Sequence, residues 1–515
     1  MRDNEVVNVG TEPLSFDDVV KVARHGATVH LTDDAVAAVA AARTRVDELA
    51  ESPVPAYGVS TGFGALATRH IEPSLRARLQ RSLIRSHAAG SGPEVETEVT
   101  RALMLLRLRT LATGHTGVRP KTTKALQGLL NAGITPVVHE YGSLGCSGDL
   151  APLSHVALTI MGEGVVRDAS GRLTDAAEAL KQAGVEPVEL AAKEGLALVN
   201  GTDGMLGMLI LAMDDLTRLF RVADVGAAMS IEALLGTDRV FAADLQALRP
   251  HPGQAASAAN LRALLAGSQI MDSHRDGTCT RVQDAYSLRC APQVAGAARD
   301  TLAHAASVAA RELASAIDNP AVLADGRVES NGNFHGAPVG YVLDFLAIAA
   351  ADMASISERR TDRMLDVARS HGLPAFLADD PGVDSGHMIA QYTQAAIVSE
   401  LKRLAVPASV DSIPSSAMQE DHVSMGWSAA RKLRRSVDGL TRVLAVEILT
   451  AARALDMRAP LRPAPATAAV VACLRQAVSG PGPDRFLAPE IESTVRLVAD
   501  DSVVAAAEAV TGPLA

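Results

Sequence analysis

The segment Gly142–His155 (GSLGCSGDLAPLSH) has the composition needed to turn the main chain itself into an electrophile. Gly142, Gly145 and Gly148 recur at every third position, and glycine costs about 1 kcal/mol relative to alanine inside a helix. The spacing therefore predicts a turn and not a helix. In a tight turn, the amide nitrogen of Gly148 can close on the carbonyl carbon of Cys146, because glycine allows this close approach.

Loss of two water molecules would complete the chemistry of this turn. A peptide amide is a poor nucleophile because its lone pair is delocalised, so the turn has to force the approach. The first loss yields an imidazolone ring. Loss of the Ser147 hydroxyl as the second water leaves an exocyclic C=CH2 group, which is a strong electrophile. A Ser-Gly pair alone is most often an ordinary turn, so this interpretation depends on motifs elsewhere in the chain.

Polar residues and glycine interrupt the apolar pattern at other points, and such interruptions between helices commonly carry function. These segments are Tyr57–Gly64 (YGVSTGFG), Val199–Gly204 (VNGTDG), Val282–Pro292 (VQDAYSLRCAP), Ser330–Pro338 (SNGNFHGAP) and Asp411–Gly426 (DSIPSSAMQEDHVSMG). They contain tyrosine, arginine, amide and carboxylate side chains that a helical scaffold does not need.

The elements that position these segments are predicted to be helices. Of the 515 residues, 48% are apolar and only 3% are aromatic, and a chain rich in Ala, Leu and Val suits close-packed helices. Apolar residues recur at intervals of three and four over 430–458, as they do on one helix face. Similar patterns cover 296–318 and 340–367, and residues 74–113 also indicate helix.

The predicted fold class is therefore all-α. We expect an elongated central helical bundle together with a more irregular N-terminal part that bears the glycine-rich turn. The two domains are placed at residues 1–200 and 201–515, so that the long helical patterns fall in the second.

Charge and the remaining motifs exclude several classes of protein. A net charge of −11 argues against nucleic-acid binding. The four cysteines form no CxxC pair, and His335, His387 and His422 form no HExxH-like set, so we predict no metal. The charged N-terminus is unlike a signal peptide, and the apolar stretch 204–213 is too short to span a membrane. We expect a cytoplasmic protein with a small-molecule substrate and neither a nucleic-acid nor a membrane partner.

Taken in order, the motifs resemble those of the aromatic amino-acid ammonia-lyases and aminomutases, which carry a 4-methylidene-imidazol-5-one (MIO) group. The resemblance covers nearly the whole chain, from YGVSTGFG to QEDHVSMG. Most members have Ala-Ser-Gly in the turn, whereas this chain has Cys146, Ser147 and Gly148. The resemblance implies an MIO group formed autocatalytically from these three residues, with no metal and no external organic cofactor. It also implies an aspartase/fumarase-like all-α fold and a homotetramer whose active sites are shared between subunits.

Within this family, the chain is most similar to the histidine ammonia-lyases. Ser86 and His87 stand where those enzymes have Ser-His, and SAMQEDHVSMG, which contains Glu420, matches their pattern. The implied reaction is L-histidine to trans-urocanate and ammonia, the first step of histidine degradation. The residues that depart from many relatives are Asp203, Ala337 and Met418, which stand in place of Gln, Glu and Asn.

By this resemblance, Tyr57 is the base that removes the β-proton of the substrate. Arg289 binds the substrate carboxylate through its planar guanidinium. Tyr286 would share a helical face with Arg289 and help to hold the electrophile or the amine. Asn200 and Gln283 polarise the MIO carbonyl oxygen or orient the amine. Taken singly, each of these side chains also has an ordinary structural explanation, such as packing, capping or a surface ion pair.

His87 and Glu420 are the predicted specificity pair. Glu420 would accept a hydrogen bond from the substrate imidazole, which a phenyl ring cannot donate. Phe334 and Met388 are expected to line the substrate pocket. Whether the amine or the imidazole of the substrate attacks first is left open, and we prefer the amine.

Two alternatives also stay open. One is a lyase or aminomutase of the same family that acts on tyrosine, phenylalanine or another amino acid. The other is a helical scaffold without activity, which the intact Ser147-Gly148 pair disfavours.

Overall fold

The computed structural model describes residues 5–52, 57–62, 64–66, 68–275, 279 and 281–515. The chain forms two compact units, and each collects separate stretches of sequence. The first unit comprises Met1–Leu211, Ala306–Asp344 and Pro407–Arg431, and the second comprises Ala212–Ala305, Phe345–Val406 and Lys432–Ala515. The division at residue 200 that we expected for two domains stays a prediction, while the compact units follow these discontinuous bounds.

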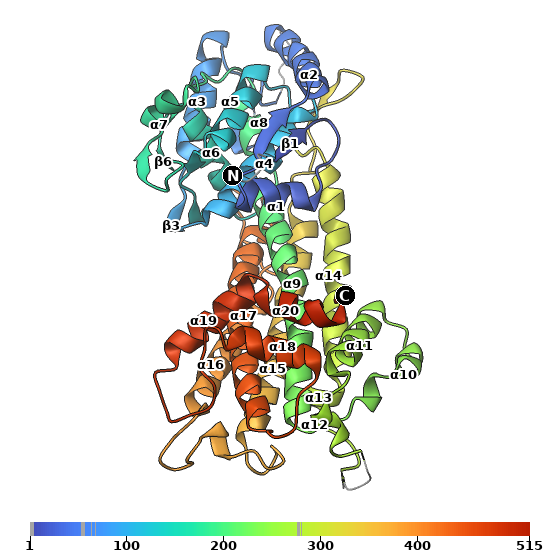
Figure 1. Cartoon of the computed structure of the whole chain (residues 1–515). Coiled ribbons are helices and arrows are strands. Elements are labelled where there is room, and N and C mark those ends of the chain that lie inside the picture. The colour runs from blue at the N-terminus through green and yellow to red at the C-terminus, as the bar shows by residue number, and fades with distance from the viewer. Residues whose placement is uncertain (1–4, 53–56, 63, 67, 276–278, 280) are drawn as a thin grey trace. The chain divides into compact units, whose positions relative to one another are not determined.

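The first unit combines short helices with all the strands found in the described residues (Figure 1). Its helices are α1 (Phe16–Arg24), α2 (Asp33–Glu51), α3 (Arg76–His87), α4 (Thr97–Ala112), α5 (Pro120–Asn131), α6 (Leu150–Ile160), α7 (Ala176–Ala183), α8 (Glu194–Val199) and the start of α9 (Asp203–Ala233). Single 3-10 turns lie at Gly64–Leu66 and Pro73–Leu75.

The strands of the first unit form small separate sheets. β1 (Val6–Val9) pairs in parallel with β2 (Thr28–Leu31), in a register that joins Val6 to Thr28. The antiparallel pairs are β3 (Ser91–Glu94) with β5 (His139–Tyr141), β4 (Thr135–Pro136) with β6 (Val165–Arg167), β6 with β7 (Leu173–Asp175), and β8 (Ala321–Val322) with β9 (Val328–Glu329). Strands this short serve to close loops and do not build a sheet core.

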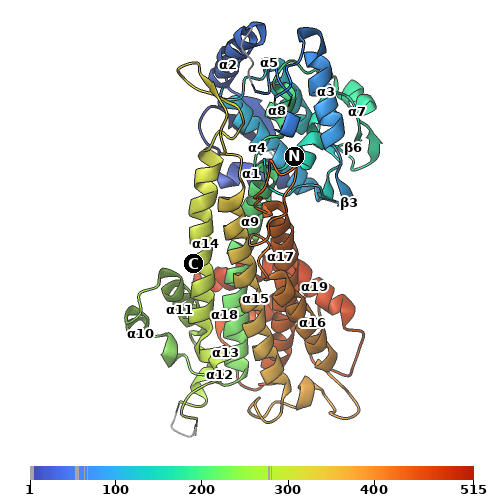
Figure 2. The same ribbon diagram turned by 180° about the vertical axis from the view of Figure 1, so that it is seen from behind.

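Helices and loops make up the second unit, with no strand of a sheet among its described residues. Its helices are the rest of α9, α10 (Ala243–Ala247), α11 (Pro252–Leu265), α12 (Gln269–Asp272), α13 (Tyr286–Arg289), most of α14 (Ala291–Ala314), α15 (Ala337–Leu365) and α17 (Gly426–Asp456), and α16 (Met388–Leu404), α18 (Pro465–Leu474), α19 (Ala488–Ala499) and α20 (Ser502–Thr511), with 3-10 turns at Arg239–Phe241 and Ala375–Leu377. The long helices α9, α14, α15 and α17 run alongside one another (Figure 2). The predicted all-α bundle is confirmed, and the patterns over 296–318, 340–367 and 430–458 correspond to α14, α15 and α17.

The helical prediction over 74–113 is confirmed for most of its length, but the segment is divided into two helices. Helix α3 ends at His87 and α4 begins only at Thr97. The residues between them include Gly92, which has a φ of +91°, and Pro93, which has no N–H to donate to a helix. No leucine lies between Leu83 and Leu103, so the leucine spacing stops before this break. The interruption matters because it puts His87 at a helix end.

Helix α4 is the buried centre of the first unit. Every residue over 99–112 is buried, although Arg101, Arg107 and Arg109 are among them. Their guanidinium groups are accommodated because they donate to main-chain carbonyls; Arg101, for example, reaches Val22 at 3.0 Å and Leu130 at 3.2 Å. Buried donors that find acceptors in this way avoid most of the cost of desolvation and tie neighbouring segments to the helix.

A buried ion pair crosses the helical core of the second unit. Glu447 on α17 accepts hydrogen bonds from Arg360 on α15 at 2.9 Å and from Ser230 on α9 at 2.8 Å. An unpaired buried charge is strongly destabilising. The pair therefore selects which faces of these three helices pack together.

Two helical stretches, Glu194–Ala233 and Ala337–Leu365, are long and apolar enough to cross a membrane by length and composition alone. The most apolar window of the first is 100% buried inside the protein, and that of the second is 67% buried. Such burial is typical of the core helices of a helical domain.

His387 is a buried histidine that precedes α16 in the second unit. It is 2% exposed, and its Nδ1 lies 3.2 Å from the hydroxyl of Thr450 on α17. Burial first, and then the positive charges of Arg453, Arg485 and Arg475, lower the pKa of His387 to about 3. The imidazole is therefore neutral in the folded protein at ordinary pH.

We expect the free energy of unfolding to decrease as the pH falls from about 6.5 towards the folded pKa of His387. The unfolded imidazole takes up a proton near its ordinary pKa of about 6.5, whereas the folded one stays neutral until about 3. The unfolded state thus binds more protons in this window, so stability rises with pH there.

The variant His387→Asn keeps a polar group beside Thr450 and removes this titration. Between pH of about 4 and about 6.5, its unfolding free energy should vary less with pH than that of the parent, by up to about 3 kcal/mol. Urea unfolding across this pH range measures the difference. Equal pH dependence in the two proteins would contradict the assignment.

Candidate active site

The segment Gly142–His155 forms a glycine turn followed by α6, as the spacing predicts. Gly142, Gly145 and Gly148 have φ values of +143°, +64° and +87°, in the region that residues with a Cβ rarely adopt. At Gly148 a Cβ would also overlap the main-chain O, C and N atoms of Gly201. Both conformation and space therefore require glycine at this position.

Asp149, which sequence analysis did not single out, anchors the turn to the start of α9. Its N–H donates to the carbonyl of Gly201 at 2.7 Å. Its fully buried carboxylate accepts hydrogen bonds from Ser143 Oγ and from the N–H groups of Gly204 and Met205, each at 2.9 Å. Burial raises the pKa of Asp149 to about 7, and these hydrogen bonds oppose the shift. The sequence signal that could have identified Asp149 is its position directly after the Ser147-Gly148 pair.

A distant segment of the chain holds the other side of the turn. The hydroxyl of Ser424 donates to the carbonyl of Gly145 at 2.7 Å. The indole N–H of the buried Trp427, at the start of α17, donates to the carbonyl of Glu140 at 2.7 Å. The main chain around residues 142–148 is therefore fixed from two directions.

Glu420 lies against the tip of the turn. Its Oε1 accepts a hydrogen bond from Ser147 Oγ at 3.3 Å, and its Oε2 accepts one from Ser415 Oγ at 3.0 Å. Cys146 is only 7% exposed. Burial, and then the Glu420 carboxylate, raise the pKa of the Cys146 thiol to about 12. The thiol therefore stays protonated and is a poor nucleophile.

His87 lies near the same carboxylate. It is the last residue of α3 and is half-buried, with Nδ1 3.1 Å from the hydroxyl of Ser86. Burial lowers the pKa of His87, and the charge of Glu420 opposes that shift. Of the predicted specificity pair, Glu420 therefore contacts Ser147 directly, and His87 lies within the electrostatic range of Glu420.

Tyr57 lies on a loop that packs against α8. Its phenol oxygen accepts a hydrogen bond from the N–H of Gly64 at 3.3 Å. The next residue, Gly58, has a φ of +71°, and a Cβ there would come within 2.7 Å of Leu196 Cδ2. Phe63, in the same loop, lies outside the described residues.

Asn200 follows α8 directly and is 3% exposed. Its side-chain Nδ2 donates to the carbonyl of Asn319 at 3.0 Å, and its own carbonyl accepts from Arg107 at 2.7 Å. The neighbouring Gly201 contacts Gly148, so Asn200 lies next to the glycine turn.

Phe334 is half-buried in the loop before α15. Two residues on, the N–H of Gly336 donates to the carbonyl of Gly145 at 3.3 Å. The ring of His335 stacks on that of His422, with centroids 5.8 Å apart and planes 5° from parallel. These contacts join the Phe334 loop to both the glycine turn and the segment that carries Glu420. Among the described residues, no group of three or more His, Cys, Asp or Glu side chains is arranged to hold a metal ion.

The other predicted site residues belong to the second unit. Tyr286 and Arg289 share one face of the short helix α13, and the Arg289 guanidinium carbon lies 4.6 Å from the centre of the Tyr286 ring. This cation–π contact holds the guanidinium over the ring. Tyr286 is 71% exposed. Gln283 is exposed, and Met388 is half-buried at the start of α16.

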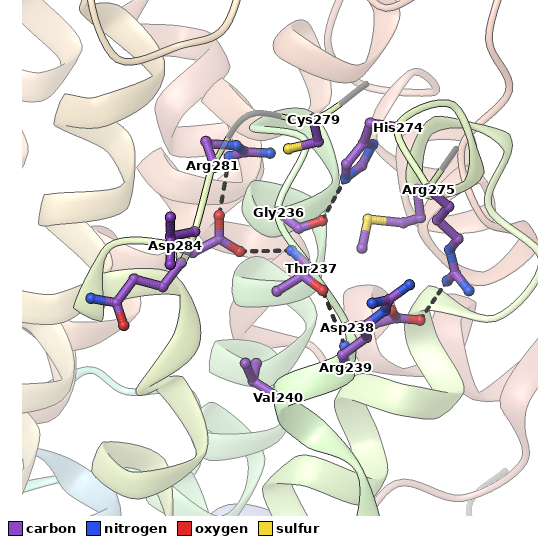
Figure 3. A pocket seen from close by; sticks show the side chains of 13 residues that line it. Gly236, Thr237, Asp238, Arg239, Val240, His274, Arg275, Cys279, Arg281 and Asp284 are labelled. Carbon is purple, nitrogen blue, oxygen red and sulfur yellow. Dashed lines mark hydrogen bonds and ion pairs between the residues drawn. The ribbon is translucent and has the colours of Figure 1, made fainter. Parts of the chain in front are cut away.

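A cavity of about 370 Å³ lies in the second unit beside Gln283 (Figure 3). Its lining includes Arg281, whose guanidinium donates to Asp284 at 3.0 Å, and Arg275, which pairs with Asp238 at 2.7 Å. Both arginines are thus neutralised by their own carboxylate partners. Of the predicted site residues, Gln283 is the one that lines this cavity.

The three departures from the family pattern have different surroundings. Asp203 is buried at the start of α9, with Oδ2 3.3 Å from the Arg107 Nε. Met418 has a φ of +69°, in the left-handed region that asparagine tolerates better. Ala337 is the first residue of α15, and nothing in the structure explains the replacement there.

Comparison with known proteins places these features in one family. A family model described as aromatic amino acid lyase matches residues 14–476. The chain is 68% identical over 510 residues to a histidine ammonia-lyase of Streptomyces avermitilis, with 99% of each chain covered. It is 50% identical over 512 residues to one of Sorangium cellulosum, with 98% of this chain and 99% of that one covered.

Solved structures agree with this result. A tyrosine aminomutase from Streptomyces globisporus has a TM-score of 0.93 at 39% identity, with 99% of this chain and 100% of that one covered. A histidine ammonia-lyase from Trypanosoma cruzi has a TM-score of 0.90 at 38% identity, with 99% and 96% covered. With the fold, the glycine turn and these matches in agreement, the chain belongs to the aromatic amino acid lyase family.

Proposed function

We propose that this enzyme deaminates L-histidine without oxidation, giving trans-urocanate and ammonia. The observation that carries the proposal is the contact between Ser147 and Glu420 in the first unit, where Ser147 Oγ lies 3.3 Å from the Glu420 carboxylate, whose charge also acts on His87. The high identity to histidine ammonia-lyases over almost the full chain supports the same assignment.

The electrophile in this proposal is an MIO group formed from Cys146, Ser147 and Gly148. The Gly148 nitrogen attacks the Cys146 carbonyl carbon, and two waters leave, one of them with the Ser147 hydroxyl. The residues present fit this group, because Gly148 has a φ of +87° and no space for a side chain. When formed, the group supplies an electrophilic carbon that binds the substrate amine or, in the other route, its imidazole.

The hydrogen bonds on either side of the turn favour this ring closure. Asp149 binds Gly201 and the start of α9, and Ser424 binds the Gly145 carbonyl. Because these segments are already ordered, bringing the two reacting main-chain atoms together loses little further entropy. The protonated Cys146 thiol does not compete as a nucleophile.

The first unit supplies the groups that bind the imidazole and take the β-proton. The Glu420 carboxylate accepts a hydrogen bond from the imidazole N–H, beside His87. Tyr57 removes the β-proton, and its hydrogen bond from Gly64 orients the phenol. Asn200 presents its amide to the electrophile or to the amine. Phe334 lines the same pocket.

The proposal assigns the amino-acid end of the substrate to a further set of groups. Arg289 holds the substrate carboxylate, and its stacking on the Tyr286 ring leaves the N–H edge of the guanidinium free for this bidentate contact. Gln283 orients the amine, and Met388 contributes to the pocket wall.

The proposal includes a homotetramer whose active sites are shared between subunits. Tyr286 is 71% exposed although its proposed role is in an active site. Large apolar side chains are exposed on α15 and α16, among them Phe345, Ile348, Ile389 and Tyr392. Such groups on a helical surface are typical of a protein interface. A cytoplasmic location is proposed with it, and the net charge of −11 disfavours a nucleic-acid partner.

A second candidate is a family member that acts on tyrosine or phenylalanine. The observation in its favour is the TM-score of 0.93 to a tyrosine aminomutase. His87 and Glu420 favour histidine, because a phenyl ring offers no donor to the carboxylate. Incubating the enzyme with histidine, tyrosine and phenylalanine in parallel, and following ultraviolet-absorbing products, separates the candidates. Product from tyrosine or phenylalanine alone would reject the histidine assignment.

The Ser147→Ala variant should fold normally and lose at least about a thousandfold in kcat, because it has no hydroxyl to eliminate. The parent protein should be lighter than its sequence mass by about 36 Da, the mass of two waters, and the variant should not show this deficit. Intact mass spectrometry and urocanate absorbance measure both effects. Ser170→Ala, at an exposed turn serine, is the matched control and should behave as the parent. Full activity in Ser147→Ala would show that the reaction does not need the proposed electrophile.

Replacing Glu420 by Gln should lower kcat/KM for histidine about 10- to 100-fold, because a charge-assisted hydrogen bond to the imidazole is lost. Any slow turnover of phenylalanine should change much less. Steady-state kinetics on both substrates give the ratio. Glu48→Gln, at an exposed glutamate on α2, serves as the control. An equal loss of kcat/KM on the two substrates would show that Glu420 does not recognise the imidazole of the substrate.

A further inference from the structure

Lys193 and Asp318 form an ion pair whose two side chains are completely buried in the first unit. Lys193 Nζ also donates to the carbonyl of Thr116 at 2.8 Å, and Asp318 Oδ1 accepts from the N–H of Asn319 at 2.8 Å. Removing two charges from water costs several kcal/mol for each ion, so such a pair is weak evidence for a gain in stability. Its position in the chain suggests a different role.

The pair joins the two ends of α8 to a single short segment. Lys193 immediately precedes α8 and has a left-handed φ of +70°, while Asn200 immediately follows the helix. Asp318 binds Lys193, and the carbonyl of the next residue, Asn319, accepts the hydrogen bond from Asn200 Nδ2 at 3.0 Å. A non-glycine residue with this φ persists only where its surroundings determine it strongly.

Arg107 connects the same two segments a second time. Its guanidinium donates to the carbonyls of Ala197 at 3.2 Å and Asn200 at 2.7 Å, and to that of Ile317 at 3.0 Å. The end of α8 is therefore held near residue 317 by charge-assisted hydrogen bonds, while the ion pair holds the beginning of the helix against Asp318.

The same segment also supports the Tyr57 loop. A Cβ on Gly58 would lie 2.7 Å from Leu196 Cδ2 on α8 and 3.4 Å from Pro320 Cδ. Because Gly58 follows Tyr57 directly, a shift of α8 against residues 318–320 would disturb this loop and Asn200 together.

We propose that the Lys193–Asp318 pair is a positioning element of the active site, which fixes α8 against residues 318–320 and thereby holds the Asn200 amide beside the Gly148 turn. The inference rests on the proposed catalytic role of Asn200. Neither Lys193 nor Asp318 touches substrate; both act through Asn200. A displacement of about 1 Å in a catalytic group can cost about a hundredfold in rate, so loss of the pair should appear in kcat and leave KM for histidine nearly unchanged.

A double-mutant cycle between Asp318→Asn and Asn200→Ala tests the proposal. In the parent background, Asp318→Asn should lower kcat for urocanate formation about 10- to 100-fold. In the Asn200→Ala background the same change should lower kcat by less than about threefold, because the group that the pair positions is already absent. A pair with a merely structural role would lower kcat equally in both backgrounds, and that outcome would overturn the proposal.

Asp224→Asn is the matched control in the second unit. Asp224 is also buried and pairs with Arg299 at 2.7 Å, and it also accepts hydrogen bonds from Ser257 and Asn260. We expect it to lower the thermal unfolding midpoint with no difference between the two Asn200 backgrounds. The intact-mass deficit should persist in Asp318→Asn, and its loss would mean that the pair acts on ring closure and not through Asn200.

Hydrogen exchange gives a readout that does not depend on activity. Amides over 194–203 should exchange faster in Asp318→Asn than in the parent, and unchanged exchange there would also overturn the proposal. This measurement separates failure of the inference from failure of the proposed function, which would appear as no urocanate from the parent enzyme. If Asp318→Asn does not fold, Lys193→Arg takes its place in the double-mutant cycle. This variant keeps the positive charge but changes the length and shape of the side chain. Its effect on kcat should likewise be smaller in the Asn200→Ala background than in the parent.

Discussion

The main chains of Gly148 and Gly201 lie so close together that no side chain fits between the two segments, and the position of the glycine turn depends on this contact. A Cβ on Gly148 would overlap the Gly201 main chain, and the N–H of Asp149 donates to the Gly201 carbonyl. The turn before α6 is therefore joined to the turn before α9. The Asp149 carboxylate strengthens the joint, because it accepts N–H groups at the start of α9, where the helix dipole favours a negative charge.

Three buried charges of the first unit lie next to these turns. Arg107 donates to the Ala197 carbonyl on α8 and pairs with Asp203 at the start of α9, and Lys193, directly before α8, pairs with Asp318. Apolar residues could fill the same volume, but they would not fix the orientation of a backbone segment as hydrogen bonds do. This difference is a physical reason for placing costly buried ions next to the glycine turn.

The features that sequence analysis predicted correctly are those with a local signal. The glycine spacing predicts the turn at 142–148, and apolar periodicity predicts α14, α15 and α17. The break between α3 and α4 was not predicted, although Gly92 and Pro93 disfavour a helix there and no leucine lies between Leu83 and Leu103. Asp149 was missed for another reason: two of the three groups that donate to its carboxylate, the N–H groups of Gly204 and Met205, lie in a distant segment.

By itself, the sequence determined the residue types that ring closure at 146–148 requires, the helical class of the fold and the family of the chain. Only the tertiary structure decided that Ser147 meets Glu420, 273 residues further along the chain, and that His87 lies near the same carboxylate. The contacts of Asn200 with Asn319 and of Lys193 with Asp318 are likewise seen only in the tertiary structure. The physical reason is that turn conformation and helical periodicity arise from neighbouring residues, whereas contacts between distant segments depend on how the whole unit packs.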